Sequence, residues 1–461
     1  MTNTMPLSLA TVILAGGLVL LMPAGFSLLS MGLCRARNAA QIISTNLILS
    51  ALSVLGFWAF GFALLSGGAT APDGEWSLSI FGHSFGLMGR RGFFLSGLGG
   101  DPQALCRFFF QAAVVMLAVM IPAGVMAERW RFSSAIPCGF WSAAFPIALF
   151  GNWVWGGGWL AQLGQNLGLG HGFVDFAGSS VIHMAGGVAG LMGALALGPR
   201  LNKYSRDGRP RPMPGHNLGC VISGTLLLAA GWLGFNIGPS LMAAPERAPL
   251  IAVNTILAAA AGAVAACALV TMKFRKPDPS MICNGLLAGL VAISGPCAFV
   301  NGAGAFIIGA VAGVLVVYSV LFLEGTMKVD DPIGAVSVHA VGGAWGVLSL
   351  GLLADGSYGA GWNGVHAASK TGVEAGVTGL LGPLFGAPSA DASQLLAQLI
   401  GAAACLIFAG LSAWAWFKVA GRIQPLRSRH EDEMAGLDLP EMGAECYPDF
   451  HLTDKGSSRG D

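Results

Sequence analysis

Charged residues are scarce in this 461-residue chain: Asp, Glu, Lys and Arg together make up 10%, whereas 54% of the residues are hydrophobic. A water-soluble core does not explain a mean hydropathy of +0.68. Long apolar runs of the length needed to cross about 30 Å of hydrocarbon instead predict a membrane protein. No charged residue falls in the middle of a run, since Asp175, Asp331 and Glu128 all stand at run ends.

Other signals are missing as well. The nine cysteines include no C-x-x-C pair, which argues against a disulfide framework and against a thiolate metal site. No nucleophile, base and orienting residue occur together at any depth, so we expect neither an enzyme nor a cofactor. No basic region precedes the first apolar run, which favours a first membrane span over a cleaved signal peptide; processing of the N-terminus stays open.

The apolar runs predict an all-α membrane protein with eleven transmembrane helices. Their predicted bounds are 9–33, 40–66, 105–127, 134–155, 175–198, 217–238, 250–272, 281–300, 304–323, 332–354 and 394–418. This divides the chain into a membrane domain over 1–420 and a polar tail over 421–461. The longest loops, 67–104 and 355–393, are interpreted mainly as spacers.

The distribution of basic residues predicts the orientation. With the N-terminus outside, 19 of the 24 Lys and Arg residues lie on the cytoplasmic side, whereas the reverse orientation would place five there. We therefore expect a multi-pass protein of the cell's inner (plasma) membrane with a cytoplasmic tail. The same bias explains the basic loop from Arg200 to Arg211, so nucleic acid is not an expected partner.

Two segments 156 residues apart read as copies of one another. Asp175 precedes His183 by eight residues, and Asp331 precedes His339 by eight. Three glycines follow each histidine at i+3, i+4 and i+7, on one helical face that another helix can approach closely. The copies fall on spans five and ten, so the second five-helix unit would be inverted relative to the first, as in many transporters.

The two histidines are the groups at membrane depth best suited to titrate near neutral pH. Facing imidazoles can share one proton, because each ring offers a donor and an acceptor nitrogen, and the pair could relay a proton without a bare cation in hydrocarbon. A lone buried histidine is more often a hydrogen-bonded core residue. Haem ligation by the pair is a further alternative, which an absorption spectrum would test.

Carboxylates and rings could complete a cation site. Asp175 and Asp331 can each cap the following helix, with Pro332 at a first helical position; alternatively their charge favours a cation nearby. Phe110, Trp155, Trp232 and Phe235 bring rings to membrane depth or its edge. A ring face holds a cation for about 0.5–2 kcal/mol, far below the cost of dehydrating it. An ammonium ion would therefore have to lose its proton before crossing the apolar interior.

These motifs resemble those of the ammonium transporter/Rhesus superfamily, as a divergent bacterial-type member. The two Asp…His segments carry the resemblance most specifically, and it extends over all predicted spans and the tail. Supporting matches are Ala24-Gly25-Phe26, Arg35-Ala36-Arg37-Asn38, Ala127-Glu128-Arg129, Trp153-Val154-Trp155, Gly234-Phe235-Asn236 and Gly436-Leu437-Asp438.

The resemblance implies a homotrimer with one pore per subunit and passage of ammonia past twin histidines. His183 and His339 would be the pore pair, and Asp175 the carboxylate at the pore mouth. Phe110 and Phe235 would be stacked gate rings, and Trp155 the wall of an outer recruitment site for ammonium.

Several positions depart from the family pattern. Val114 stands where a second Phe is usual, and Pro239 replaces a Ser, with Ser240 one place later. Ser30 occupies a position where many bacterial relatives have Glu. In the tail, which the resemblance links to trimer contacts and a P-II-type regulatory protein, Met442 stands where relatives usually show His.

Ammonium transport with an altered recruitment site is thus the first functional hypothesis. Val114 creates room beside Trp155, so transport of a larger amine or a choline-like quaternary ammonium is the second. A non-conducting ammonium sensor that signals through its tail is the third.

Overall fold

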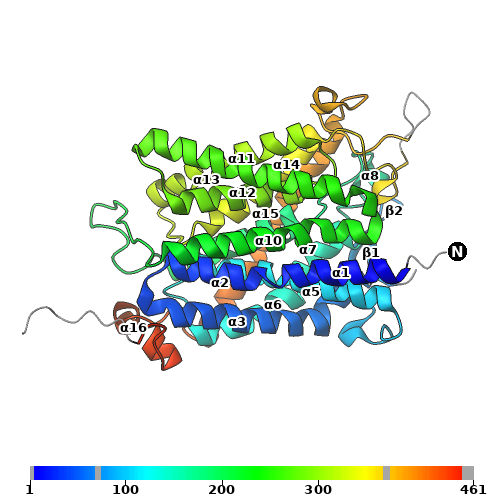
Figure 1. The fold of residues 1–461 in the computed structure, drawn as a ribbon. Coiled ribbons are helices and arrows are strands. Elements are labelled where there is room, and N and C mark those ends of the chain that lie inside the picture. Colours follow the sequence, from blue (N-terminus) through cyan, green and yellow to red (C-terminus); the bar gives the residue numbers. More distant parts are fainter. Residues whose placement is uncertain (1–4, 68–73, 367–373, 449–461) are drawn as a thin grey trace, which may run out of the picture.

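The computed structural model describes residues 5–67, 74–366 and 374–448, and the last part of the predicted tail, 449–461, lies outside these ranges. Long, roughly parallel helices form one bundle (Figure 1). The first nine α-helices are α1 (Met5–Val19), α2 (Met22–Leu33), α3 (Ala39–Gly56), α4 (Phe62–Ser66), α5 (Pro102–Val125), α6 (Phe132–Ala144), α7 (Pro146–Trp155), α8 (Leu163–Leu167) and α9 (Ala185–Leu197). The remaining ones are α10 (Leu218–Ala243), α11 (Ala248–Phe274), α12 (Pro279–Ser294), α13 (Gly302–Phe322), α14 (Gly342–Leu353), α15 (Ala392–Ile423) and α16 (His430–Ala435).

Five short π-helical turns join or extend these helices: η2 (Phe57–Gly61), η4 (Ser179–Met184), η6 (Leu323–Met327), η7 (Val336–Val341) and η10 (Asp438–Met442). The prediction of an all-α protein is right for the bundle but misses one hairpin. Strands β1 (Glu75–Ile80) and β2 (His83–Gly89) pair antiparallel in the loop predicted as a spacer. Alternating Trp76, Leu78 and Ile80 in β1 carried the period-2 signal for this strand.

Ten helical segments of the described chain are long and apolar enough to cross a membrane, rather than the predicted eleven. The predicted span 281–300 corresponds to α12, which has only 16 residues. It ends at Ser294, before Gly295 and Pro296, because a proline cannot donate the backbone hydrogen bond that a continuing helix needs. In contrast, α15 continues to Ile423, past the predicted domain boundary at 420.

Prolines also divide two predicted spans into two helices each. The second helix of the first span, α2, has Pro23 in its first turn, and α7 starts with Pro146 after a break at Phe145. Pro is well accommodated in a first helical turn, where its missing N–H would lack a partner in any case.

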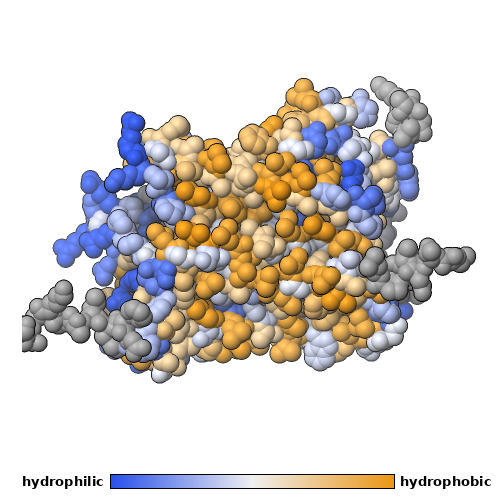
Figure 2. Space-filling model, in the orientation of Figure 1, coloured by the Kyte–Doolittle hydropathy of each residue, from blue (hydrophilic) through white to orange (hydrophobic). Residues whose placement is uncertain are grey.

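The two ends of the bundle differ. One end, here the hairpin end, carries the start of α1 and the β-hairpin, and the opposite end, the tail end, carries α16 (Figure 1). Between them a broad belt of hydrophobic side chains covers the visible face, with hydrophilic residues gathered toward both ends (Figure 2). This belt is the surface that a bilayer would cover.

Candidate functional site: a twin-histidine cavity

Both histidines lie in π-helical turns. His183 belongs to η4, which continues into α9, and His339 belongs to η7, which continues into α14. In η4 the backbone N–H of His183 donates to the carbonyl of Gly178, five residues earlier. Single π-helical turns are rare and occur frequently at functional sites, so their presence at both predicted positions supports a functional role.

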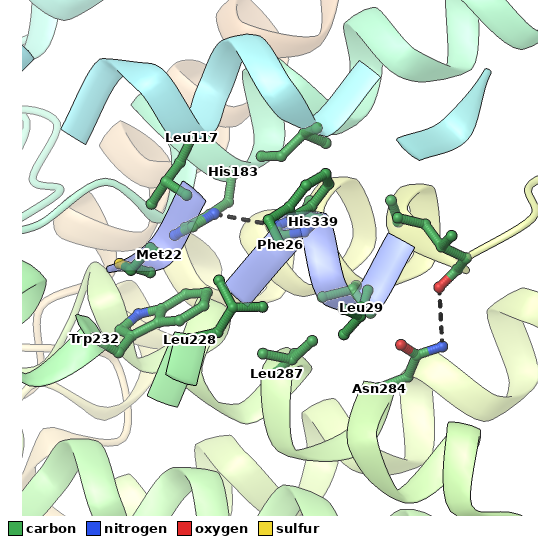
Figure 3. A pocket seen from close by; sticks show the side chains of 14 residues that line it. Met22, Phe26, Leu29, Leu117, His183, Leu228, Trp232, Asn284, Leu287 and His339 are labelled. Atoms are coloured by element: carbon green, nitrogen blue, oxygen red, sulfur yellow. Dashed lines mark hydrogen bonds between the residues drawn. The ribbon is translucent and has the colours of Figure 1, made fainter. Parts of the chain in front are cut away.

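The two imidazoles face one another inside the bundle. Their Nδ1 atoms are 3.2 Å apart and their ring centroids 5.2 Å apart, with an interplanar angle of 21° (Figure 3). At this distance one Nδ1 carries the hydrogen and the other accepts it. The Nε2 atoms then differ: one ring presents a bare acceptor there and the other an N–H donor.

A small apolar cavity borders both rings. It leaves about 20 Å³ for the centre of a water-sized molecule and is lined by Met22, Phe26, Leu29, Leu117, Ile121, His183, Leu228, Trp232, Asn284, Leu287, Ile333, Ala335, Val338 and His339 (Figure 3). Apart from the two histidines, the polar side-chain groups in this wall are the indole N–H of Trp232 and the amide of Asn284, and both donate to other residues. Nε2 of His183 is buried and has no protein partner. The cavity therefore offers a small neutral molecule a hydrogen-bonding partner in otherwise apolar surroundings.

Aromatic rings hold His183 from α10. The indole of Trp232 stacks on His183 at 4.9 Å and 19°, and Phe235 lies at 5.4 Å and 37°. The Trp232 N–H donates to the hydroxyl of Ser294 over 2.9 Å, and that hydroxyl donates to the Leu290 carbonyl over 2.8 Å. Ser294 thus fixes the ring on which His183 rests.

Asp175 caps the turn that carries His183. Its buried carboxylate accepts four backbone N–H groups and one hydroxyl, from Gly178, Ser179, Ser180 and Val181. A carboxylate with so many donors is already satisfied. The capping interpretation is therefore sufficient to explain why an acidic residue stands here.

Asp331 caps the second turn less completely. It accepts the backbone N–H groups of Ile333, Gly334 and Val336. The expectation that Pro332 opens the helix is wrong, because Pro332 lies in a turn and helical structure begins only after Gly334. Gly334 has a positive φ of 74°, which turns the chain between the aspartate and the helix.

The glycines after the histidines bring the two copies into contact. A Cβ on Gly187 would lie 2.4 Å from the backbone N of Ala340, and one on Gly343 would lie 2.3 Å from the carbonyl O of Ser179 and 2.9 Å from the N of Met184. Gly187 and Gly343 are equivalent in the two copies, as are Met184 and Ala340. The contact is therefore reciprocal, and any side chain at either glycine would push the copies apart.

The predicted gate and recruitment residues lie toward the hairpin end. Phe110 packs so closely on α10 that a Cβ on Gly238 would lie 2.1 Å from its ring. Trp155 donates its indole N–H to the backbone carbonyl of Asp175 over 2.7 Å. The hydroxyl of Ser240 donates to the carbonyl of Ile237 on its own helix, next to Pro239, and Val114 is buried. A recruitment site formed by these residues remains a prediction.

Sequence reasoning missed most of the cavity wall. Met22, Phe26 and Leu29 on α2 repeat at i, i+4 and i+7, as do Leu228, Trp232 and Phe235 on α10. That spacing marks one helical face, but apolar faces are common in a membrane protein and do not single out a pore. Ser294 and Asn284 gave no signal in the sequence.

Comparison with known proteins identifies the family. A model of the Ammonium Transporter Family matches residues 10–447. The chain belongs to the ammonium transporter family.

The alignments with related proteins extend over nearly the whole length of this chain. Ammonium transporter Amt2 of Archaeoglobus fulgidus is 39% identical over 98% of this chain and 90% of the relative, and the ammonium transporter of Bacillus subtilis is 32% identical over 94% and 96%. The solved structure of a Sensor Amt Protein is similar with a TM-score of 0.80 and 30% identity, covering 94% of this chain and 98% of the other. Mep2 of Saccharomyces cerevisiae has a TM-score of 0.75 at 24% identity, covering 91% and 89%, which shows the shared fold. The family is one of membrane transporters, not of enzymes.

At the tail end this ammonium transporter family member has a buried cluster of charges. Glu128 pairs with Arg35 at 3.0 Å and with Arg200 at 2.7 Å, and Arg200 also pairs with Asp330 at 2.9 Å. Burial alone would raise the pKa of Glu128, but the arginine charges and hydrogen bonds lower this pKa to about 2. Asp330 likewise has a pKa of about 2, because Arg200 outweighs its burial. The cluster is therefore fully ionised at neutral pH.

Acidic residues of the tail dock on backbone N–H groups of the membrane domain. Asp438 accepts the N–H of Gln41 in the first turn of α3, and Glu441 accepts that of Phe132 at the start of α6. Glu433 accepts the N–H of Leu201. Helix starts attract carboxylates because their first N–H groups lack partners and carry partial positive charge. The family member thus holds its own tail against two membrane helices.

Proposed function

We propose that this protein conducts ammonium across the membrane as ammonia and a separately relayed proton, using the cavity beside His183 and His339. The observation that carries the proposal is the 3.2 Å contact between the two Nδ1 atoms above an apolar cavity. Relatives named as ammonium transporters, at 31–39% identity over nearly the whole chain, support the choice of substrate.

The cost of dehydration decides which species passes. Moving a bare ammonium ion into an apolar interior costs of order 20 kcal/mol by the idealised Born estimate. A cation–π contact with one aromatic ring stabilises the ion by only about 0.5–2 kcal/mol. Neutral ammonia avoids this cost, and as it passes it can donate to the bare Nε2 of one histidine and then accept from the Nε2–H of the other. The proton left behind can enter at the bare Nε2 of one ring while the shared Nδ1 hydrogen moves to the second ring, which then releases the hydrogen from its own Nε2.

The size of the cavity favours ammonia over the larger amines. Space of about 20 Å³ for a molecular centre fits a molecule as small as water. A quaternary ammonium would need the walls of Phe26, Leu117 and Trp232 to move. The space that Val114 would leave beside Trp155 belongs to the predicted outer recruitment site and does not enlarge the cavity beside the histidines. Transport of a larger amine is therefore the second candidate function.

The architecture that we propose follows from the reciprocal contact. Equivalent glycines facing equivalent residues of the other copy are what a two-fold axis between inverted five-helix units produces. The short α12 then counts as the eighth of eleven spans, with the hairpin end outside and the tail in the cytoplasm, as the basic residues predict. We further propose the family's homotrimer, with a P-II-type protein as a partner at the tail.

Currents from reconstituted protein on a solid-supported membrane test this function. Ammonium, methylammonium, choline and potassium should be compared for the native chain, His183→Ala and His339→Ala. We expect an ammonium current in the native protein, and loss of current or of discrimination against potassium in each variant. Unchanged currents and ion selectivity in both variants would rule out the relay, and a choline current in the native protein would favour the larger amine.

A further inference from the structure

Three buried polar side-chain atoms without a protein partner belong to residues that line one small cavity at the tail end. They are Oγ1 of Thr45 and Nδ2 of Asn46 on α3, and Nε1 of Trp130 in the turn after α5. All three residues are at least 95% buried, and all three line one cavity together with Gln41, Ile42, Ala123 and Ala127. An unsatisfied buried donor is costly, and three around one space are not expected by chance.

We propose that this cavity is a binding site for one water molecule that joins α3 to the turn carrying Trp130. The space available to the centre of a water-sized molecule is about 10 Å³, which suits a single small occupant. Buried waters of this kind typically make about three hydrogen bonds to otherwise unpaired groups. Three such groups are present.

The donors in the wall decide the chemistry of the occupant. The amide N–H of Asn46 and the indole N–H of Trp130 can only donate, so the occupant must accept two hydrogen bonds. It can donate in return to the hydroxyl oxygen of Thr45. Water does both, whereas an ammonium ion has no lone pair and cannot accept either bond. The site therefore selects water against the cation that we propose as the transported substrate.

The site lies directly beneath the docked tail. The Gln41 amide, in the same wall, donates to the carbonyl of Trp130 over 3.1 Å. Residues on both sides of Trp130 pair with the tail linker: the N–H of Arg131 donates to Leu426, and the N–H of Ser428 donates to Arg129. A water that fixes Trp130 thus stabilises the surface against which residues 426–428 lie.

A structure of the full chain at a resolution that shows ordered water is the direct test. We expect density within hydrogen-bonding distance of Thr45, Asn46 and Trp130, and we expect it equally in protein purified without any ammonium salt. An empty cavity overturns the proposal, and so does density that disappears when ammonium is left out.

A double-mutant cycle provides a second test that does not depend on resolution. Thr45→Val removes one partner of the water with little change in shape and should lower the melting temperature by about 2 °C. Trp130→Phe removes a second partner together with part of the buried ring, so it should lower the melting temperature by more. The double variant should lose less than the sum, because the first substitution already releases the water. Thr225→Val, in α10, removes a buried hydroxyl elsewhere and serves as the control, since it should be additive with Trp130→Phe. Additivity of Thr45→Val with Trp130→Phe would overturn the proposal.

Discussion

The two Asp…His segments share their spacing and a π-helical turn, but their hydrogen bonding differs. In the first, Asp175 is 2% exposed and accepts five hydrogen bonds, one of them from the hydroxyl of Ser180. In the second, Asp331 is half-buried and its donors are backbone N–H groups, among them those of Ile333, Gly334 and Val336. The position equivalent to Ser180 is Val336, which has no hydroxyl to donate.

A second serine adds to the difference. The hydroxyl of Ser179 donates to the carbonyl of Val291 over 2.7 Å and accepts the N–H of Gly295 over 2.6 Å, which ties the first segment to the end of α12. Its equivalent, Ala335, can do neither. The turn between Asp175 and His183 is thus held by more hydrogen bonds than the turn between Asp331 and His339. The difference arises because the first copy has two serine hydroxyls that the second copy lacks.

Removing the two aspartates should show this difference most strongly. Asp175→Ala leaves four buried N–H groups without their acceptor and should destabilise the protein by about 3–5 kcal/mol, whereas Asp331→Ala should cost about 1–2 kcal/mol. Melting temperatures of the purified proteins in detergent would measure both. Equal losses, or a larger loss for Asp331→Ala, would show that the hydrogen bonds do not set the rigidity of the two turns.

Acid should weaken the tail end. The unfolded chain takes up protons on Glu128 and Asp330 near their ordinary pKa values of 4.5 and 3.8, while the folded chain keeps them ionised down to about 2. Stability from the cluster is therefore complete above about pH 4.5 and is lost as the pH falls toward 2. Melting curves over this range should show the decline, and Glu128→Gln should flatten it while lowering stability at neutral pH, since Arg200 loses one of its two buried carboxylate partners. A stability that does not change between pH 4.5 and 2 would contradict the lowered pKa values of Glu128 and Asp330 in the folded protein.

The hairpin end should respond to pH in the opposite sense. Burial raises the pKa of Glu75 in β1 from 4.5 to about 7. The folded hairpin then binds this proton more tightly than the unfolded chain, so the contribution is present below pH 4.5 and is lost as the pH rises to 7. Hydrogen exchange of the hairpin amides should therefore speed up over this range in the native chain and change less in Glu75→Gln. If exchange, corrected for its intrinsic rate, slows as the pH approaches 7, deprotonation of Glu75 does not destabilise the hairpin and this prediction is wrong.

Loss of the Ser294 hydroxyl should affect His183 more than His339. Only His183 rests on the ring that Ser294 holds, whereas His339 lies 6.4 Å from Phe26. We expect Ser294→Ala to reduce the ammonium current by about fivefold, the equivalent of a lost hydrogen bond of about 1 kcal/mol, and to change its pH profile. Ser294→Thr keeps the hydroxyl and should restore the profile. An Ala variant with native current and pH profile would exclude a positioning role.

The smallest effect should be at the outer mouth. Val114→Phe introduces the ring that the family resemblance leads us to expect there, and it should tighten the apparent affinity for ammonium by a factor of roughly 2 to 30, the equivalent of about 0.5–2 kcal/mol. Concentration series of the current, with ammonium and with methylammonium, would measure it. If neither the affinity nor the tolerance of larger amines changes, the recruitment site does not include position 114.

The sequence alone predicted the membrane class, a functional role for His183 and His339 as a pair, and a close helix approach at the glycines that follow them. Hydropathy and a repeated spacing can be recognised in the sequence without knowledge of the fold. The resemblance of the motifs to a known family then predicted the overall fold. Hydropathy did not show that α12 is shorter than the other spans, because Gly295 and Pro296 end it after 16 residues; ten of the described helical segments, rather than eleven, therefore have the full length of a span.

Only the tertiary structure decided how each motif is used. It paired the Nδ1 atoms, placed Trp232 between Ser294 and His183, and left Thr45, Asn46 and Trp130 around one cavity. It also showed that Asp175 serves its own turn through five hydrogen bonds, which spacing could not separate from a cation site. The physical reason is that such contacts join residues far apart in the chain, and their distances depend on how whole helices pack rather than on local pattern.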